Sequence, residues 1–239
     1  MINDIHDFEI DKESKSGRPL VLGLVEKTHY LEVAVTVAIV AFLTSLIIAV
    51  AVPYGFVFPL LTVVFLLIAY GYSAPPIRFR YNPFHSVAIG LASATVFLFG
   101  LLTPLTVFQE TAGVLVPSKI DMSAPSSEAW LIMLIILLAL SVAPMITDLK
   151  DYEADKKAKV RSIYVVFGLD IGKKIVSVLT LVLFLLPLIL FHSLLDIAVF
   201  LALSVLSFLS FYKLESYELV FSCYFVVLIY GLARYVGLF

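Results

Sequence analysis

Charged residues are scarce in this sequence. Asp, Glu, Lys and Arg make up 14% of its 239 residues, whereas soluble globular domains carry about 25%. Apolar residues make up 62%, and the mean hydropathy is +1.06. This balance excludes an ordinary soluble domain and indicates a protein whose surroundings are a lipid bilayer. No basic stripe is interleaved with aromatic residues, so nucleic acid is not an expected partner.

Cysteine and several short functional motifs are rare or missing. Cys223 is the single cysteine, so no internal disulfide forms, and this residue is expected to pack as a small side chain. The sequence has no Gly-rich phosphate loop, no CxxC or HExxH motif and no EF-hand loop. Its histidines are scattered, and none is assigned a metal. No Ser or Cys nucleophile has evident His and Asp partners, and no cleavable signal peptide is expected.

Long apolar runs dominate the chain instead. A helix needs about 20 residues to cross about 30 Å of hydrocarbon, and only helices and closed barrels satisfy every backbone group in lipid. The runs do not alternate polar and apolar residues as barrel strands would. The sequence therefore predicts an all-α membrane protein, a polytopic transmembrane helical bundle with about seven spans. The predicted spans are 33–52, 54–72, 86–108, 129–147, 175–191, 197–212 and 219–239.

The positive charges indicate how these spans are oriented. If the spans simply alternate, every Lys and Arg except Lys119 and Arg234 falls on one side of the membrane. The positive-inside rule places that side in the cytoplasm, so we expect a multi-pass protein of the cell membrane with short cytoplasmic cap helices. On the other side, 109–128 is predicted to be an ordinary solvated loop. The cytoplasmic connections are 1–32, 73–85, 148–174 and 213–218.

Two aspartate triplets on the cytoplasmic side share one spacing. On a helix, positions i, i+3 and i+7 fall within roughly 60° of one face, so each triplet forms a row of like charges. One such row alone is most often a solvated helix end, whereas two matching rows favour a site. Carboxylates suit Mg²⁺, which proteins usually hold with one or two of them together with substrate phosphates. Facing rows would hold Mg²⁺ ions against one diphosphate. The triplets are Asp4, Asp7 and Asp11, and Asp148, Asp151 and Asp155.

Three segments together resemble the UbiA-type intramembrane prenyltransferases. "NDIHDFEIDKESKSGRPL" resembles the first aspartate-rich motif of that family, "YSAPPIRFR" its Tyr-Ser-x-Pro-Pro-x-Arg segment, and "DLKDYEADKKAKVRS" its second aspartate-rich motif. They stand in family order, with two spans between each successive pair. The resemblance implies a single transmembrane domain over 1–239 that transfers a prenyl group from a polyprenyl diphosphate through an allylic carbocation. The acceptor would be hydrophobic, either an aromatic or quinone precursor or a lipid alcohol.

The resemblance also implies roles for individual residues. Both triplets would bind Mg²⁺, and Arg18 and Arg78 would bind diphosphate oxygens, since guanidinium groups match phosphate geometry. Tyr72 would donate its hydroxyl. The implied catalytic residues are Asp4, Asp7, Asp148, Asp151 and Asp155; the substrate-binding residues are Asn3, Asp11, Arg18, Tyr72 and Arg78; and the metal ligands are Asp4, Asp7, Asp11, Asp148, Asp151 and Asp155.

One departure from the family and two other functions remain open. The family has nine spans, and its first motif closes the second; here Asn3 is nearly the first residue, so we expect the first span and most of the second to be missing. One alternative is a non-catalytic membrane protein such as a small transporter, and the other is a truncated relative that only binds a prenyl diphosphate. Transporters place ionisable residues near the bilayer midplane, and no predicted span does so, which favours an enzyme.

Overall fold

The computed structural model describes residues 2–13, 17–51, 55–102, 105–111, 114–121 and 126–238. Each predicted span corresponds to a helix, and within these residues six helices are long and apolar enough to cross a membrane. The remaining apolar helix, α4, has 17 residues. Their lengths and composition are those of an integral membrane protein. The long helices are α3 (Lys27–Ala51), α4 (Val57–Ser73), α5 (His85–Leu102), α6 (Ser127–Thr147), α9 (Leu169–Leu185), α10 (Leu194–Leu214) and α11 (Tyr217–Tyr235).

Hydroxyl caps and prolines explain where several of these helices begin and end. Ser126 accepts a hydrogen bond from the amide of Ala129 at 3.2 Å and so caps α6, because the first amides of a helix have no partner within it. Helix α6 then continues through Pro144. Helix α9 gives way to the short 3-10 helix η2 (Leu186–Ile189), which contains Pro187. Proline removes a backbone donor, which accounts for the change of helix type.

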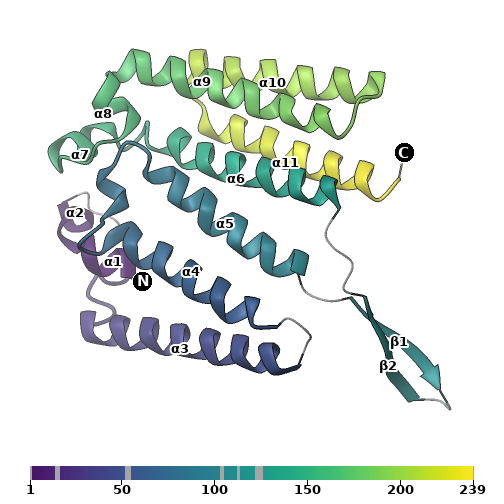
Figure 1. Ribbon diagram of the computed structural model, residues 1–239. Coiled ribbons are helices and arrows are strands. Elements are labelled where there is room, and N and C mark those ends of the chain that lie inside the picture. The colour runs from purple at the N-terminus through teal and green to yellow at the C-terminus, as the bar shows by residue number, and fades with distance from the viewer. Residues whose placement is uncertain are drawn as a thin grey trace.

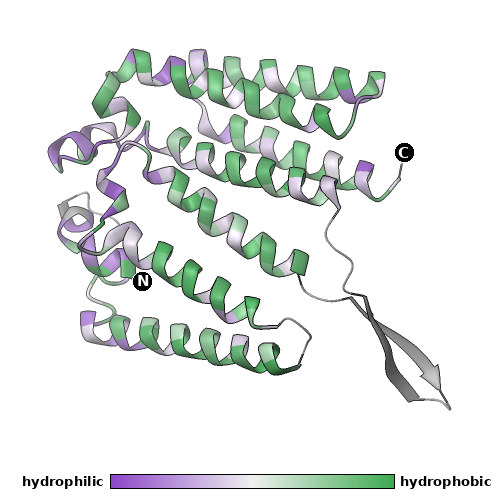
Figure 2. Ribbon diagram, in the orientation of Figure 1, coloured by the Kyte–Doolittle hydropathy of each residue, from purple (hydrophilic) through white to green (hydrophobic). Residues whose placement is uncertain are grey.

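The long helices lie side by side, and the short ones gather at one end (Figure 1). Helices α3 to α6 pack in chain order, α9 packs against α6 and α10, and α11 packs against α10. We call the end that carries the short helices the polar end, because hydrophilic residues concentrate there while the long helices are mainly hydrophobic (Figure 2). The short helices are α1 (Ile2–His6), α2 (Phe8–Glu13), η1 (Phe79–Tyr81), α7 (Tyr152–Lys157) and α8 (Ile163–Phe167).

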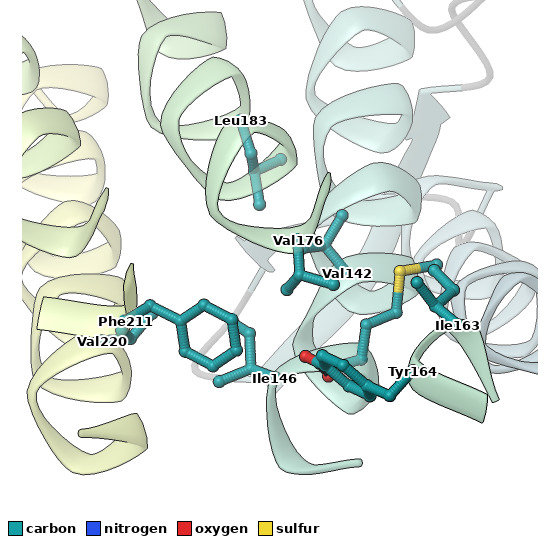
Figure 3. Packing of buried hydrophobic residues seen from close by; sticks show 9 residues of the cluster. Val142, Ile146, Ile163, Tyr164, Val176, Leu183, Phe211 and Val220 are labelled. Carbon is teal, nitrogen blue, oxygen red and sulfur yellow. Dashed lines mark hydrogen bonds between the residues drawn. The ribbon is translucent and has the colours of Figure 1, made fainter. Parts of the chain in front are cut away.

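A hydrophobic cluster fixes α8 against the long helices (Figure 3). Tyr164 is fully buried, and its hydroxyl donates to the carbonyl of Met145 at 2.7 Å, so its one polar atom has a partner. The cluster therefore holds the chain on either side of the second aspartate triplet. It contains Val142, Met145, Ile146, Ile163, Tyr164, Val176, Leu183, Phe211 and Val220.

The segment after α5 differs from the prediction. The sequence predicted a span to residue 108 and a plain loop over 109–128, whereas α5 ends at Leu102 and two antiparallel strands follow, β1 (Leu105–Thr111) and β2 (Val114–Asp121). Both strands are rich in Val, Thr, Ile and Phe, which favour extended backbone. The loop prediction was wrong because it rested on the polar residues of 109–128 and gave no weight to the residues that favour strands. The hairpin projects from the end opposite to the polar end (Figure 1).

A buried ion pair joins α10 and α11 at the end away from α7 and α8. Asp196 is fully buried and receives two bonds from Arg234, at 2.8 and 3.0 Å, and one from the Tyr230 hydroxyl at 2.7 Å. It also accepts the amide of Ser193 at 2.9 Å, completing a reciprocal cap at the start of α10. The sequence had shown only that Arg234 interrupts the last span. Its pairing explains how that charge is accommodated.

Candidate active site at the polar end

The first aspartate triplet winds across the junction of α1 and α2. Asp4 lies in α1, Asp7 lies between the two helices, and Asp11 lies in α2. The amide of Asp7 donates to the carbonyl of Asn3 at 2.9 Å, and the amide of Asp11 donates to that of Asp7 at 2.8 Å. Both are the i to i−4 bonds of an α-helix, so the chain keeps its helical winding where α1 bends into α2. The three carboxylates therefore stay on one side, although the predicted single helix is interrupted.

The second triplet spans a turn instead of one helix. Helix α6 ends at Thr147, Asp148 is its C-cap, Asp151 precedes α7, and Asp155 lies within α7. The amide of Asp151 donates to the carbonyl of Asp148 at 3.1 Å, and the amide of Asp155 donates to that of Asp151 at 2.8 Å. Steps of three and four residues again keep the side chains on a common side. The three aspartates thus follow one another along a turn between two helices, and not along the single helix that was predicted.

Two arginines pair with the first triplet. Arg18 contacts Asp4 at 2.5 Å and Asp11 at 2.8 Å, while Arg80 pairs with Asp7. Asp7 and Asp11 are 2% and 5% exposed, so these two carboxylates are largely desolvated and interact more strongly with nearby charges. Arg18 therefore lies among the aspartates of the first triplet, and its predicted contact with diphosphate stays a prediction. Arg80 was not among the predicted residues.

Arg80 lies where the sequence predicted Arg78. Arg78 is exposed, adopts a left-handed backbone with φ of 47°, and places its guanidinium 5.8 Å from the centre of the Tyr81 ring. Arg80 follows two residues later within η1 and turns toward Asp7. The Tyr-Ser-x-Pro-Pro-x-Arg motif ends at Arg78, and the sequence did not show that the turn would direct Arg80 toward Asp7. The position of Arg78 gives its predicted contact with diphosphate no support.

The segment between α4 and α5 contacts both triplets. The hydroxyl of Ser73 donates to the side-chain carbonyl of Asn3 at 2.5 Å, which ties the end of α4 to the first motif. His85, the first residue of α5, lies 3.2 Å from Asp148 through its Nε2 atom. The Tyr72 and His85 rings meet edge to face with centres 6.3 Å apart. The three motifs that the sequence singled out therefore meet at one place, with Tyr72 and Asn3 in it.

Charge couples the two triplets through the arginines. Arg80 acts electrostatically on Asp7 and Asp11 of the first triplet and on Asp155 and Asp151 of the second. Burial raises the pKa of Asp7 and of Asp11, and the nearby guanidinium groups oppose that rise. Both triplets thus lie within electrostatic reach of the Arg80 guanidinium.

Asp155 has the most clearly perturbed carboxyl of the second triplet. Burial, followed by the charge of Asp148, raises its pKa to about 6. Its side chain is largely removed from solvent, at 8% exposure. A nearby cation would act in the opposite direction and lower the pKa of this carboxyl, because the cation favours its charged form.

The donor set fits Mg²⁺ in its chemistry. Six carboxylates from the two triplets offer the hard oxygen atoms that this ion prefers. Among the described residues, no three His, Cys, Asp or Glu side chains come together closely enough to hold a metal ion by themselves. Mg²⁺ in proteins commonly takes one or two carboxylates together with waters and substrate phosphates.

An apolar cavity of about 220 Å³ adjoins the charged centre at Tyr72. It runs between α4 and α5, and its other walls include Phe65, Ile68, Ile89 and Val96. Tyr72 thus belongs both to the cavity and to the cluster of motif residues. A charged centre opening onto an apolar cavity suits a ligand with a charged head and a hydrocarbon part.

Comparison with known proteins decides the family. A model of the UbiA prenyltransferase family matches residues 1–232. The chain belongs to this family. It is also similar to a solved structure of a digeranylgeranylglyceryl phosphate synthase, at 22% identity and a TM-score of 0.58, over 95% of this chain and 74% of the other. At that identity the likeness shows the fold. No curated protein matches the chain.

Membership in the UbiA family confirms the predicted resemblance and the predicted helical membrane bundle. Prenyl transfer is accordingly the general chemistry to which this site belongs. The residues that carried the resemblance are those that meet at the polar end. The structure adds Arg80 and His85 to them, neither of which the sequence had assigned to the site.

Proposed function

We propose that this UbiA-family chain transfers a prenyl group from a polyprenyl diphosphate to a hydrophobic acceptor, with Mg²⁺ held by the two aspartate triplets. The observation that carries the proposal is the meeting of the two aspartate motifs at the turn that joins α4 and α5. Arg80 in that turn pairs with Asp7, and His85 at its end lies 3.2 Å from Asp148. These contacts bring two segments about 140 residues apart in the chain to one charged centre. A diphosphate needs such a centre.

The charged centre serves the leaving group. Breaking the allylic carbon–oxygen bond of the donor transfers the electron pair to the diphosphate oxygen and leaves a cation on the prenyl carbon. Arg18 and Arg80 carry guanidinium groups that donate paired hydrogen bonds to phosphate oxygens. Bound Mg²⁺, held by carboxylates of the two triplets, would stabilise the same negative charge as a Lewis acid.

The apolar cavity serves the prenyl carbon. An allylic cation reacts rapidly with water, so productive transfer needs a site from which water is excluded. The cavity walls are aliphatic and aromatic, and Tyr72 lies where the cavity meets the charged centre. Its ring face stabilises positive charge, and its hydroxyl is a donor toward diphosphate. Asn3, bonded to Ser73, holds the first motif against α4.

The polar end would face the cytoplasm. Fourteen of the sixteen Lys and Arg residues would lie on that side of the membrane, which is the arrangement that the positive-inside rule associates with the cytoplasmic leaflet. A donor with a charged head would then enter from the aqueous side, with its hydrocarbon part directed into the bilayer. Labelling of single cysteines introduced at Lys157 and at Lys119 in intact cells tests this orientation.

The acceptor belongs to one of two chemical classes, an aromatic or quinone precursor or a lipid alcohol. The similar solved structure is named for a glyceryl phosphate lipid, which makes an alcohol of that type the first acceptor to test. In either case transfer ends with loss of one proton, from the ring carbon or from the hydroxyl oxygen that has formed the new bond to the prenyl carbon.

A reconstituted product assay tests the proposal. The chain in lipid nanodiscs is given allylic diphosphates of several lengths, Mg²⁺ and acceptors of both classes, and products are identified by mass spectrometry. We expect prenylated acceptor and released pyrophosphate, both lost in Asp148→Asn and Asp155→Asn. Asp170→Asn, an exposed carboxylate at the start of α9, is the matched control and keeps activity.

Two results favour the alternatives, one from that assay with added binding measurements and one from a flux assay on the chain in sealed vesicles. Saturable binding of an allylic diphosphate with no product for any acceptor identifies a binding protein. Movement of a solute across sealed vesicles with no chemical turnover identifies a transporter. Either result overturns the proposed transfer.

A further inference from the structure

We propose that His85 is a positioning residue that fixes the orientation of the Asp148 carboxylate for metal and diphosphate binding. The inference rests on the proposed function, because it concerns how one of the two triplets is held. Sequence analysis found His85 to be one of four scattered histidines and gave it no role. The structure places it in direct contact with the second triplet.

The contact engages one oxygen of the carboxylate. Nε2 of His85 lies 3.2 Å from Oδ2 of Asp148, and the side chains are 6% and 16% exposed. With Oδ2 directed at the imidazole, the carboxylate cannot rotate freely about its last bond. Oδ1 is then the atom presented to a cation. A ligand oriented in advance loses less conformational freedom on binding.

The imidazole ring is itself held in place. Its Nδ1 atom lies 3.1 Å from the carbonyl oxygen of Asn82. Carbonyl and carboxylate oxygens only accept, so the ring makes both contacts as an imidazolium, in which Nδ1 donates to Asn82 and Nε2 donates to Asp148. The amide of His85 donates to the same oxygen at 3.0 Å, and the side chain of Asn82 accepts the amide of Phe84 at 3.0 Å. The Tyr72 ring packs edge to face on the other side. His85 is therefore anchored at the start of α5.

Close packing of α5 on α6 sets the distance between the two residues. At Gly90 an added Cβ would overlap the hydroxyl of Ser141 and the carbonyl of Leu137, so the two helix backbones approach closely there. Gly90 follows His85 by five residues, and Ser141 precedes Asp148 by seven. The contact between His85 and Asp148 thus lies just beyond a rigid crossing of the two helices.

His85 differs from the two arginines in the length and mobility of its side chain. Asp4, Asp7 and Asp11 pair with guanidinium groups at the ends of long side chains, which can transfer to diphosphate oxygens when these arrive. A short imidazole anchored to backbone cannot follow a ligand. His85 therefore keeps Asp148 in one orientation with or without substrate. Loss of such an outer partner typically weakens metal binding about 10–100-fold.

Titration of Mn²⁺ in the presence of inorganic pyrophosphate, followed by electron paramagnetic resonance of free Mn²⁺, tests the inference on the full chain in nanodiscs. We expect His85→Leu and His85→Asn, which both lose the contact with Asp148, to bind Mn²⁺ about 10–100-fold more weakly. His85→Gln keeps a donor near the Nε2 position and should restore most of the affinity. His29→Leu, at an exposed histidine of α3, is the matched control and binds as the wild type does.

The outcomes distinguish this inference from the function on which it rests. If the wild type binds no Mn²⁺ with pyrophosphate, the proposed function fails at its metal site. If the wild type binds and His85→Asn binds equally well, only the positioning role is overturned. A purely structural role predicts lower thermal stability with unchanged Mn²⁺ affinity and no rescue by His85→Gln, and that pattern also overturns it. His85→Asn keeps a polar side chain and decides the question if His85→Leu does not fold.

Discussion

Arg80 pairs with Asp7, and both side chains are largely buried, at 19% and 3% exposure. The two residues come from segments 73 positions apart, the first aspartate motif and the turn that follows α4. Their pairing fixes the first motif against the body of the helical bundle. It also places the Arg80 guanidinium close enough to the second triplet to lower the pKa of Asp155, against the larger effect of burial.

Removing the guanidinium should destabilise the fold as well as the function. Arg80→Met leaves Asp7 buried without its partner, and breaking a buried pair on one side costs about 3 kcal/mol or more. Arg78→Met, at an exposed position two residues away, should change the free energy of unfolding by less than about 0.5 kcal/mol. Denaturant unfolding in detergent measures both. Equal effects of the two variants would contradict the assignment of Arg80 to the site.

The double variant Arg80→Met with Asp7→Leu distinguishes the cost of an unpaired buried charge from the cost of altered packing. It removes both charges, so it should be more stable than Arg80→Met alone, since no unpaired carboxylate is left buried. Prenyl transfer stays absent in the double variant because a leaving-group partner is gone.

Asp155 should make stability depend on pH in a recognisable direction. Its folded pKa of about 6 lies above its ordinary value of 3.8, so the folded chain favours the protonated carboxyl. The stability from this group is fully present below about pH 4 and is lost as the pH rises through about 6, by at most about 3 kcal/mol. Asp155→Asn should lack this loss. Unfolding midpoints of both proteins between pH 4 and pH 7.5 provide the comparison.

Mg²⁺ should act in the opposite direction to that loss. A cation at the triplets favours the ionised carboxyl, so added Mg²⁺ raises the unfolding midpoint more at pH 7 than at pH 4.5. An equal shift at both values, or the same pH response in Asp155→Asn, would show that Asp155 is not a ligand.

Gly90 should tolerate no larger residue. Because an added Cβ overlaps Ser141 and Leu137, Gly90→Ala forces α5 and α6 apart, and overpacking of this kind typically costs about 1–3 kcal/mol. It should also weaken Mn²⁺ binding with pyrophosphate by separating His85 from Asp148. Gly100 lies on the same helix, and among the described residues no atom outside its own stretch of helix comes within 4 Å of an added Cβ, so Gly100→Ala is the control and should be neutral. Equal behaviour of the two variants would argue against the close helix crossing.

Asp196 should matter for stability and not for the site. Asp196→Leu removes the acceptor that the Arg234 guanidinium and the Tyr230 hydroxyl share, and it removes the half of the reciprocal cap of α10 in which the Asp196 carboxylate accepts the Ser193 amide. The thermal midpoint in detergent should fall, while the folded fraction keeps the wild-type affinity for Mn²⁺ and pyrophosphate. Asp196→Leu with Arg234→Leu should recover part of the midpoint. Loss of metal affinity in the folded single variant would show that this end of the bundle also controls the site.

Much of the fold could be predicted from the sequence because a long run of apolar residues is enough to identify a membrane helix. Apolar runs marked each long helix, and the equal spacing of the aspartates indicated which segments meet. The hairpin was missed for two reasons: the start of β1 was counted with the preceding span, and the polar residues of 109–128 were taken to indicate a loop. Helix ends also shifted, since α5 ends at Leu102 and not near residue 108.

The site was predicted less completely, for reasons of geometry. Arg78 and Arg80 are chemically equal in the sequence, and only the left-handed turn at Arg78 directs Arg80 inward. His85 and Asp148 lie 63 residues apart, and their contact depends on the crossing of two helices at Gly90. Asp196 and Arg234 looked like isolated charges near span ends. In each case the missing information was a contact between segments distant in the chain.

The most direct test of the account is equilibrium binding of an unreactive thiolodiphosphate analogue of the prenyl donor to the chain in nanodiscs, with and without Mg²⁺. The account predicts binding that requires Mg²⁺ and is lost in Asp7→Asn and in Asp155→Asn, one from each triplet, but retained in Asp170→Asn. Binding that is indifferent to Mg²⁺, or that survives loss of either triplet's carboxylate, would contradict a single diphosphate centre shared by the two motifs.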